Sequence, residues 1–129
     1  MRNLFLIAAL VPALAACSSA AFSRPQAPGT APADALEVNL ADFMIDPSDL
    51  TAAGPAISVD VTNDGPTPHN FSVRTASGEV LLATEDLAVG ATETLTGTLE
   101  PGDYIIFCAL AGHESLGMSG TLTVSASES

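Results

Sequence analysis

Four side chains that can bind a metal through nitrogen or sulfur stand out in the sequence. Cys108 is followed at five-residue intervals by His113 and Met118, and His69 is the other of the two histidines. A trigonal plane of two histidines and one cysteine, with a long axial methionine, is typical of copper that changes oxidation state. Structural zinc fits less well, because it prefers closely spaced pairs such as C-x₂₋₄-C and does not favour methionine.

The scarcity of cysteine supports a metal site. The chain has two cysteines, and Cys17 lies in the N-terminal segment, so Cys108 has no disulfide partner in the domain. An unpaired thiol in an exported protein is expected to be buried, reactive or bound to metal. Each of the four residues alone would fit an ordinary role in a core or a turn. Their combination predicts one copper site.

The predicted strands place these residues at one end of a sandwich. Cys108 would end a strand, and the following loop would return His113 and Met118 to the same point, with Gly112 and Gly117 allowing the tight turns. His69 would come from another strand at the same end, which a Greek-key connection permits.

The composition separates a tether from a folded domain. Residues 17–35 are rich in Ser, Ala and Pro, which predicts an extended tether, and residues 36–129 form the domain. Alternating apolar and polar residues between Gly and Pro turns predict strands at 36–41, 57–62, 70–75, 80–84, 92–99, 103–110 and 121–125. One helical turn could occupy 45–51. This pattern predicts an all-β fold, a Greek-key antiparallel β-sandwich of about seven to eight strands.

The first residues predict export and lipidation. Met1-Arg2-Asn3 carries positive charge, and the apolar run that follows to Ala16 is too short for a stable membrane span. Leu14-Ala15-Ala16-Cys17 resembles the lipobox of bacterial lipoproteins, whose cysteine is acylated and becomes the first mature residue. We expect a signal peptide at 1–16, lipidation of Cys17 and an extracytoplasmic, membrane-anchored protein. An ordinary signal peptide cleaved near Ala16 is the alternative.

The charge balance excludes two classes of function. The 129 residues include 15 Asp and Glu, 3 Arg and no Lys, for a formal net charge of −12. Nucleic-acid binding requires clustered basic residues, and the P-loop enzymes require a Gly-rich loop with a lysine, so neither class fits. A protein partner is expected to present a basic or apolar face.

Together these segments resemble the cupredoxins, the blue copper proteins that include plastocyanin, azurin and auracyanin, over about Leu36 to Val124. The resemblance lies in Pro68-His69-Asn70-Phe71, in residues 99–108, in Gly112-His113 and in residues 117–124. It implies that His69, Cys108 and His113 are in-plane copper ligands and that Met118 is the axial ligand.

The same resemblance implies roles for neighbouring residues. Asn70 would link the two copper-binding loops by hydrogen bonds and donate toward the Cys108 sulfur. The carbonyl of Pro68 could be a distant further contact, and Tyr104 would pin the loop before the strand that leads to Cys108. Ala111 stands where many members have proline, and the loop spacing leaves the subfamily open.

The function implied by the resemblance is one-electron transfer between extracytoplasmic redox proteins. His113 would be the exit for the electron, within an apolar patch formed by Leu110 and Leu116 with Ala109 and Ala111. We expect a monomer that transforms no substrate and is therefore not an enzyme, because the copper oxidases need more domains and more histidines. A copper carrier of the cell envelope is the alternative.

Overall fold

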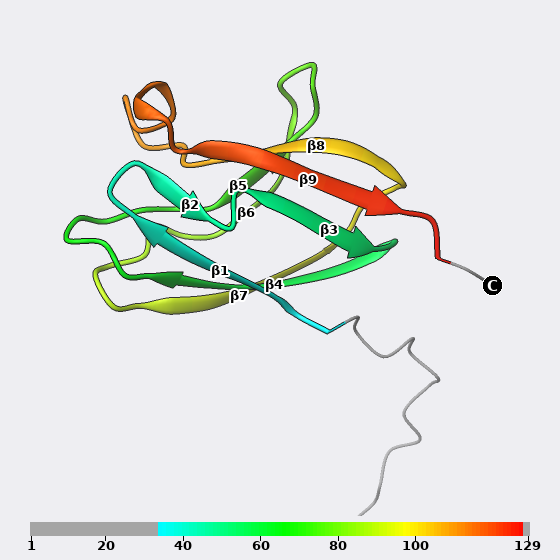
Figure 1. The fold of residues 1–129 in the computed structure, drawn as a ribbon, viewed down its shortest axis with the longest axis horizontal. Helices are drawn as coiled ribbons and strands as arrows, with labels where there is room; N and C mark the ends of the chain where they lie inside the picture. Colours follow the sequence, from blue (N-terminus) through cyan, green and yellow to red (C-terminus); the bar gives the residue numbers. More distant parts are fainter. Residues whose placement is uncertain (1–33, 128–129) are drawn as a thin grey trace, which may run out of the picture.

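The structure, a computed structural model, describes residues 34–127 as nine strands and one short helical turn (Figure 1). The predicted signal peptide, Cys17 and nearly all of the tether lie outside these residues. Among residues 34–127, no helix is long and apolar enough to cross a membrane. The elements are β1 (Leu36–Ala41), β2 (Met44–Asp46), β3 (Asp49–Ala53), β4 (Ala56–Asn63), β5 (Ser72–Arg74), β6 (Val80–Ala83), β7 (Thr92–Thr98), β8 (Gly102–Phe107), the 3₁₀ turn η1 (Glu114–Leu116) and β9 (Ser119–Ser125).

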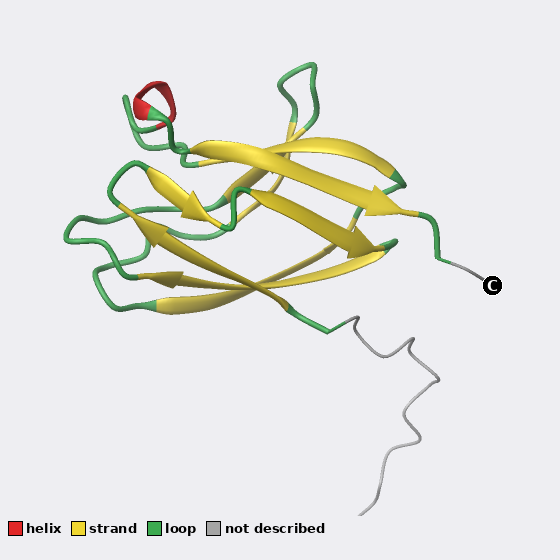
Figure 2. Cartoon of the chain, in the orientation of Figure 1, coloured by secondary structure: helices red, strands yellow, loops and turns green. Residues whose placement is uncertain are grey.

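The strands form two packed sheets, which confirms the predicted all-β sandwich (Figure 2). The orders are β2-β1-β4-β7 in one sheet and β3-β9-β8-β5-β6 in the other. The alternation of apolar and polar residues in the sequence matches the two faces of β1, where Val38 and Leu40 are buried while Glu37 and Asn39 face solvent. The inner faces meet in one core, to which Val73 and Leu122 contribute from the second sheet.

The sequence predicted an antiparallel sandwich, and five of the seven strand pairs within residues 34–127 are antiparallel, but two are parallel. β1 pairs in parallel with β4, and β3 pairs in parallel with β9. The cause is a change of sheet after β2, because β3 belongs to the opposite layer. The chain then re-enters the first sheet as β4, running in the same direction as β1. Alternation along one strand carries no information about such a crossing.

The helical turn suggested for 45–51 was also wrong, because this segment contributes to β2 and β3. Ile45 is buried in β2, and Leu50 and Ala52 are buried at alternate positions in β3. A short apolar segment fits a helical turn or a strand equally well, and only its pairing decides between them. Here the Ser48 carbonyl, between the two strands, accepts a hydrogen bond from the Thr121 amide at 2.8 Å.

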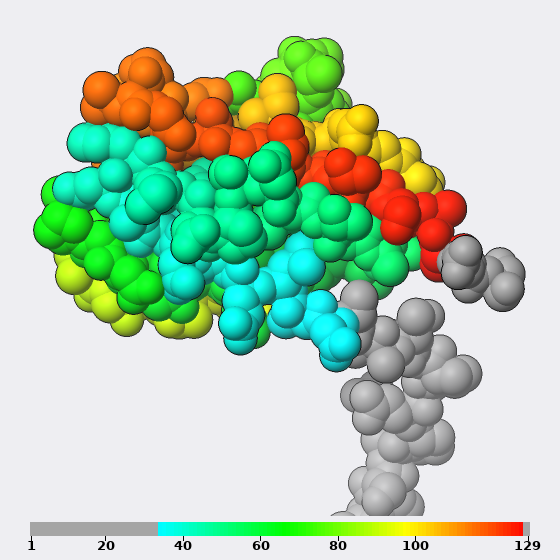
Figure 3. All heavy atoms as spheres, in the orientation of Figure 1, coloured from blue at the N-terminus to red at the C-terminus, as the bar shows by residue number. Residues whose placement is uncertain are grey.

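Three connections meet at one end of the sandwich and build the site. They are the β1–β2 turn, the β4–β5 loop and the β8–β9 loop, of which the first and last lie side by side on the surface (Figure 3). β5 and β8 are shorter than predicted: β5 begins at Ser72 and β8 ends at Phe107. His69 and Cys108 therefore lie just outside the regular strands, where their backbones pair with loops.

Candidate metal centre

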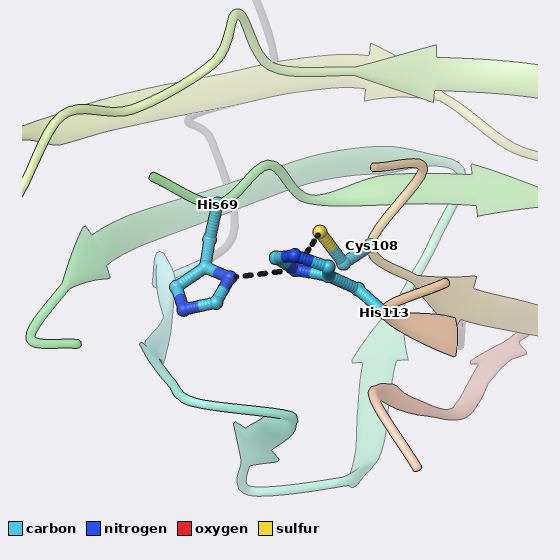
Figure 4. A group of neighbouring side chains, drawn as sticks. All are labelled: His69, Cys108 and His113. Carbon is cyan, nitrogen blue, oxygen red and sulfur yellow. Dashed lines mark hydrogen bonds between the residues drawn. The ribbon is translucent and has the colours of Figure 1, made fainter. Parts of the chain in front are cut away.

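His69, Cys108 and His113 converge at this end of the sandwich. One ligand atom from each lies within 4.8 Å of the other two. The Nδ1 atoms of the two histidines are 3.2 Å apart, and the Cys108 Sγ is 3.6 Å from Nδ1 of His113 (Figure 4). Three of the four residues singled out in the sequence thus direct their donor atoms to one point.

Backbone pairing fixes two of these residues. His69 exchanges two hydrogen bonds with Leu87, one from its amide at 3.2 Å and one to its carbonyl at 2.7 Å. The Cys108 amide donates to the Met118 carbonyl at 3.1 Å. His69 is 0% exposed and Cys108 is 1% exposed, so both donor atoms are held away from water.

His113 lies on the β8–β9 loop and is only half-buried. Its carbonyl accepts from the amides of Leu116 and Met118, at 3.1 and 3.2 Å. Gly112 and Gly117 have φ angles of 84° and 110°, the left-handed region that glycine adopts at little cost. The expectation that these glycines allow the tight loop is confirmed.

Met118 is fully buried and belongs to the same backbone network. Its amide donates to His113 and its carbonyl accepts from Cys108. The three loop residues are therefore linked to one another through the main chain, with the thioether in the core at their side. Imidazole, thiol and thioether together form the donor set that copper favours, and their arrangement fits that metal.

Asn70 connects the two loops, as the resemblance implied. Its Oδ1 accepts from the Ala109 amide at 2.7 Å. Among the described residues, the expected donation toward the Cys108 sulfur is not found, and the side-chain nitrogen of Asn70 donates instead to Asp86 Oδ1 at 2.8 Å. A carboxylate oxygen is a stronger acceptor than a thiol sulfur. Pro68 is exposed and directly precedes His69.

An ion pair braces the loop from β5, the strand next to β8 in the second sheet. Arg74 in β5 makes a two-pronged contact with Glu114, the residue after His113, and its guanidinium lies 4.2 Å from the centre of the Phe107 ring. Hydrogen bonding to Arg74 lowers the pKa of Glu114, and the same bond raises the pKa of Arg74. The brace thus joins β5, the end of β8 and the loop that carries His113.

Tyr104 pins the start of β8, because its hydroxyl donates to the Glu100 carbonyl at 2.7 Å.

The predicted docking residues differ in exposure. Leu116 is 62% exposed, and Ala109 and Ala111 are also at the surface. Leu110 is only partly exposed and packs against the core. Apolar surface at this end is extended by Phe43, which is 39% exposed and lies against His113.

Two residues of the β1–β2 turn belong to the site and were not identified from the sequence. Asp42 Oδ1 lies 3.3 Å from Nε2 of His69. The Phe43 ring meets the His113 ring edge-on, with 5.3 Å between ring centres. Neither residue forms part of a recognisable metal motif, so their role depends on a packing that local sequence does not reveal.

The comparisons with known proteins agree with this geometry. A family described as the cupredoxin-like domain matches residues 6–124. No curated protein matches the sequence. Similar solved structures include an auracyanin from the photosynthetic bacterium Roseiflexus castenholzii, with 23% identity, a TM-score of 0.64, and coverage of 73% of this chain and 98% of that one. An azurin from the methylotroph Methylomonas sp. strain J has 17% identity, a TM-score of 0.63, and coverage of 72% and 99%. At these identities the likeness is one of fold.

Proposed function

The chain belongs to the cupredoxin-like family, and from that premise we propose that it carries single electrons between redox proteins outside the cytoplasm. The proposed copper ligands are His69, Cys108, His113 and Met118. The observation that carries the proposal is the convergence of two imidazoles and a thiol within 4.8 Å, beside a buried methionine.

The residues of the site suit rapid electron transfer. Copper, when bound, would supply a one-electron couple between Cu(I) and Cu(II). His69, Cys108 and Met118 are buried, so their donor atoms are shielded from water and held by the surrounding strands and loops. Donors that are already in place need little rearrangement when the charge of the site changes.

His113 offers a route between the site and a partner protein. It is the one half-buried residue of the proposed ligand set, whereas the other three are buried. Exposed Leu116 follows His113 by three residues, and exposed Phe43 lies against the His113 ring. A small apolar surface around an exposed imidazole is suited to brief encounters, because transient redox complexes bury little area.

We further propose that the domain is a monomer attached through lipid on Cys17 to a bacterial membrane, on its periplasmic side or at the cell surface. Support comes from the Leu14-Ala15-Ala16-Cys17 sequence and from the tether that precedes β1. The acidic chain would be repelled by anionic headgroups, so an acyl chain and not charge would hold it there. Replacing Cys17 with Ser should move the protein from the membrane fraction to the soluble fraction on cell fractionation.

The test of the central proposal is a Cu(II) titration of the purified protein. We expect an intense visible absorption from thiolate-to-copper charge transfer that saturates at one equivalent, with a narrow copper hyperfine splitting in electron paramagnetic resonance. Cys108→Ser should abolish the band. A colourless wild-type protein with ordinary Cu(II) signals would contradict the proposal. Rapid loss of copper to a chelator, with slow electron self-exchange, would favour copper carriage over electron transfer.

A further inference from the structure

We propose that Asp42, in the β1–β2 turn, is a positioning residue of the metal centre that orients His69 and lowers the reduction potential of the site. The inference rests on the proposed function, since a potential is defined only for the copper-loaded protein. Its structural part, the orientation of His69, can be tested without metal.

The two nitrogens of His69 have different surroundings. Nδ1 faces the site, 3.2 Å from Nδ1 of His113. Nε2 faces the β1–β2 turn, 3.3 Å from Asp42 Oδ1 and 3.4 Å from Thr67 Oγ1. The Thr67 hydroxyl donates to the same Asp42 oxygen at 2.9 Å, so carboxylate and hydroxyl form one polar group beside Nε2.

This arrangement selects one form of the ring. A neutral imidazole carries its proton on one nitrogen and can bind a metal through the other. A carboxylate beside Nε2 favours the proton there, which leaves the Nδ1 lone pair directed at the site. Carboxylates that contact the distal nitrogen of a metal-binding histidine also increase its basicity and fix its orientation.

The Asp42 charge acts on the oxidation state as well. Cu(II) carries one more positive charge than Cu(I), so a nearby anion stabilises the oxidised form more. The His69 ring that separates the carboxylate from the site is completely buried, which limits screening along this path. The Asp42 side chain itself is 40% exposed, so solvent weakens the effect without removing it.

The turn as a whole packs on the proposed ligands. Phe43, the next residue, contacts the ring of His113 and has a φ of 58°, which is uncommon for a residue other than glycine. Its carbonyl lies 3.6 Å from the position that a Cβ would take on Gly117, the residue before Met118. Consecutive residues of one turn therefore touch both imidazoles, which a turn that merely connects β1 to β2 does not require.

The test compares Asp42→Asn with Asp64→Asn. Asparagine preserves the shape of Asp42 and an acceptor oxygen but removes the charge. Asp64 is an exposed acid in the β4–β5 loop, and among the described residues its side chain makes no hydrogen bond. Both variants change the net charge equally, so a difference between them reports the contact with His69.

We expect the midpoint potential of the copper-loaded Asp42→Asn protein to shift to a more positive value, and by clearly more than that of Asp64→Asn. Its affinity for Cu(II) should fall by about tenfold or more, the range for residues that support a metal-binding histidine. Equal shifts in the two variants, or an unchanged potential in Asp42→Asn, would overturn the proposal. A blue wild-type protein with either of these results would leave the proposed function intact.

Nitrogen-15 NMR of the metal-free protein provides the second readout. We expect His69 of the wild type to carry its proton on Nε2, and Asp42→Ala to increase the population protonated on Nδ1. A wild-type ring protonated on Nδ1, or a tautomer ratio that Asp42→Ala does not alter, would refute the orienting role. This result does not depend on whether the protein binds copper, so the two proposals can fail separately. Circular dichroism verifies that each variant is folded.

Discussion

At the scale of single residues, Met118 contributes both to the core of the fold and to the proposed copper site. Its side chain is fully buried, and its backbone bonds to both His113 and Cys108. A thioether is a soft, weak donor that favours Cu(I), whereas an amide oxygen is harder. Met118→Gln should therefore lower the reduction potential while the thiolate absorption band persists.

Redox titration of the copper-loaded variant measures this shift. The same substitution places an amide in the core, which costs about 1–3 kcal/mol of unfolding free energy if the amide lacks partners. Denaturation of the metal-free variant separates that cost from the effect on copper. A potential equal to that of the wild type would show that the Met118 sulfur is not a ligand.

Asn70 is a residue whose contribution to stability can be estimated. Its amide group accepts from Ala109 at 2.7 Å and donates to Asp86 at 2.8 Å. Each such bond contributes about 0.5–1.5 kcal/mol net, so Asn70→Ala should lower the free energy of unfolding by about 2 kcal/mol. Urea denaturation of the metal-free protein is the measurement.

Asp86→Ala is the matched control for Asn70→Ala, because it removes only the bond between the two side chains. It should cost roughly half as much, since the link from Asn70 to Ala109 remains. Equal losses in the two variants would mean that the link between the loops contributes nothing to stability.

At the scale of elements, the brace formed by Arg74, Glu114 and Phe107 holds the loop that carries His113. The Arg74 and Glu114 side chains are 22% and 38% exposed, so solvent screens their attraction. A double-mutant cycle with Arg74→Gln and Glu114→Gln should give a coupling of about 0.2–1 kcal/mol. The stronger effect is expected in dynamics, because the pair joins β5 to the loop.

Hydrogen exchange measures that effect. Amides of residues 113–118 should exchange faster in either variant, whereas those of β1 and β4, in the other sheet, should not change. If the amides of residues 113–118 exchange at the same rates in the wild type and in the variants, the loop is held by its backbone hydrogen bonds alone.

The elements also show what local sequence can and cannot predict. β1 and β4 carry alternating apolar and polar residues over 36–41 and 57–62, so their period of two was visible in the sequence. β2 has three residues and β3 has five, which is too short to distinguish from a helical turn. Whether each of these strands pairs in a parallel or an antiparallel direction depends on the sheet that it joins, and that choice is a property of the whole chain.

The site divides in the same way. Cys108, His113 and His69 could be selected because their residue types are rare in this chain and their chemistry is specific. Asp42 is one of many acidic residues, and nothing in its neighbours separates it from a solvated surface carboxylate. Its role follows from the β1–β2 turn lying against the β4–β5 loop, a contact between residues 27 positions apart.

At the scale of the whole molecule, charge is the dominant surface property. The chain has a formal net charge of −12, and Arg74, the one basic residue with a described position apart from the histidines, is paired with Glu114. The net field around residues 34–127 is thus set by carboxylates, of which only Glu114 is paired with an arginine. Such a field attracts positively charged partners and repels negative ones, and added salt reduces both effects.

Electron exchange with small redox reagents of opposite charge tests this property. A cationic metal complex should react with the copper-loaded protein faster than an anionic complex of similar potential, by about tenfold or more at low ionic strength. Stopped-flow absorbance at the charge-transfer band gives both rates. The two rates should converge as salt shortens the screening length to about 3 Å near 1 M. If the anionic complex reacts as fast as the cationic one at low salt, the acidic surface does not govern access to His113. The charge of the protein then gives no reason to expect a basic partner.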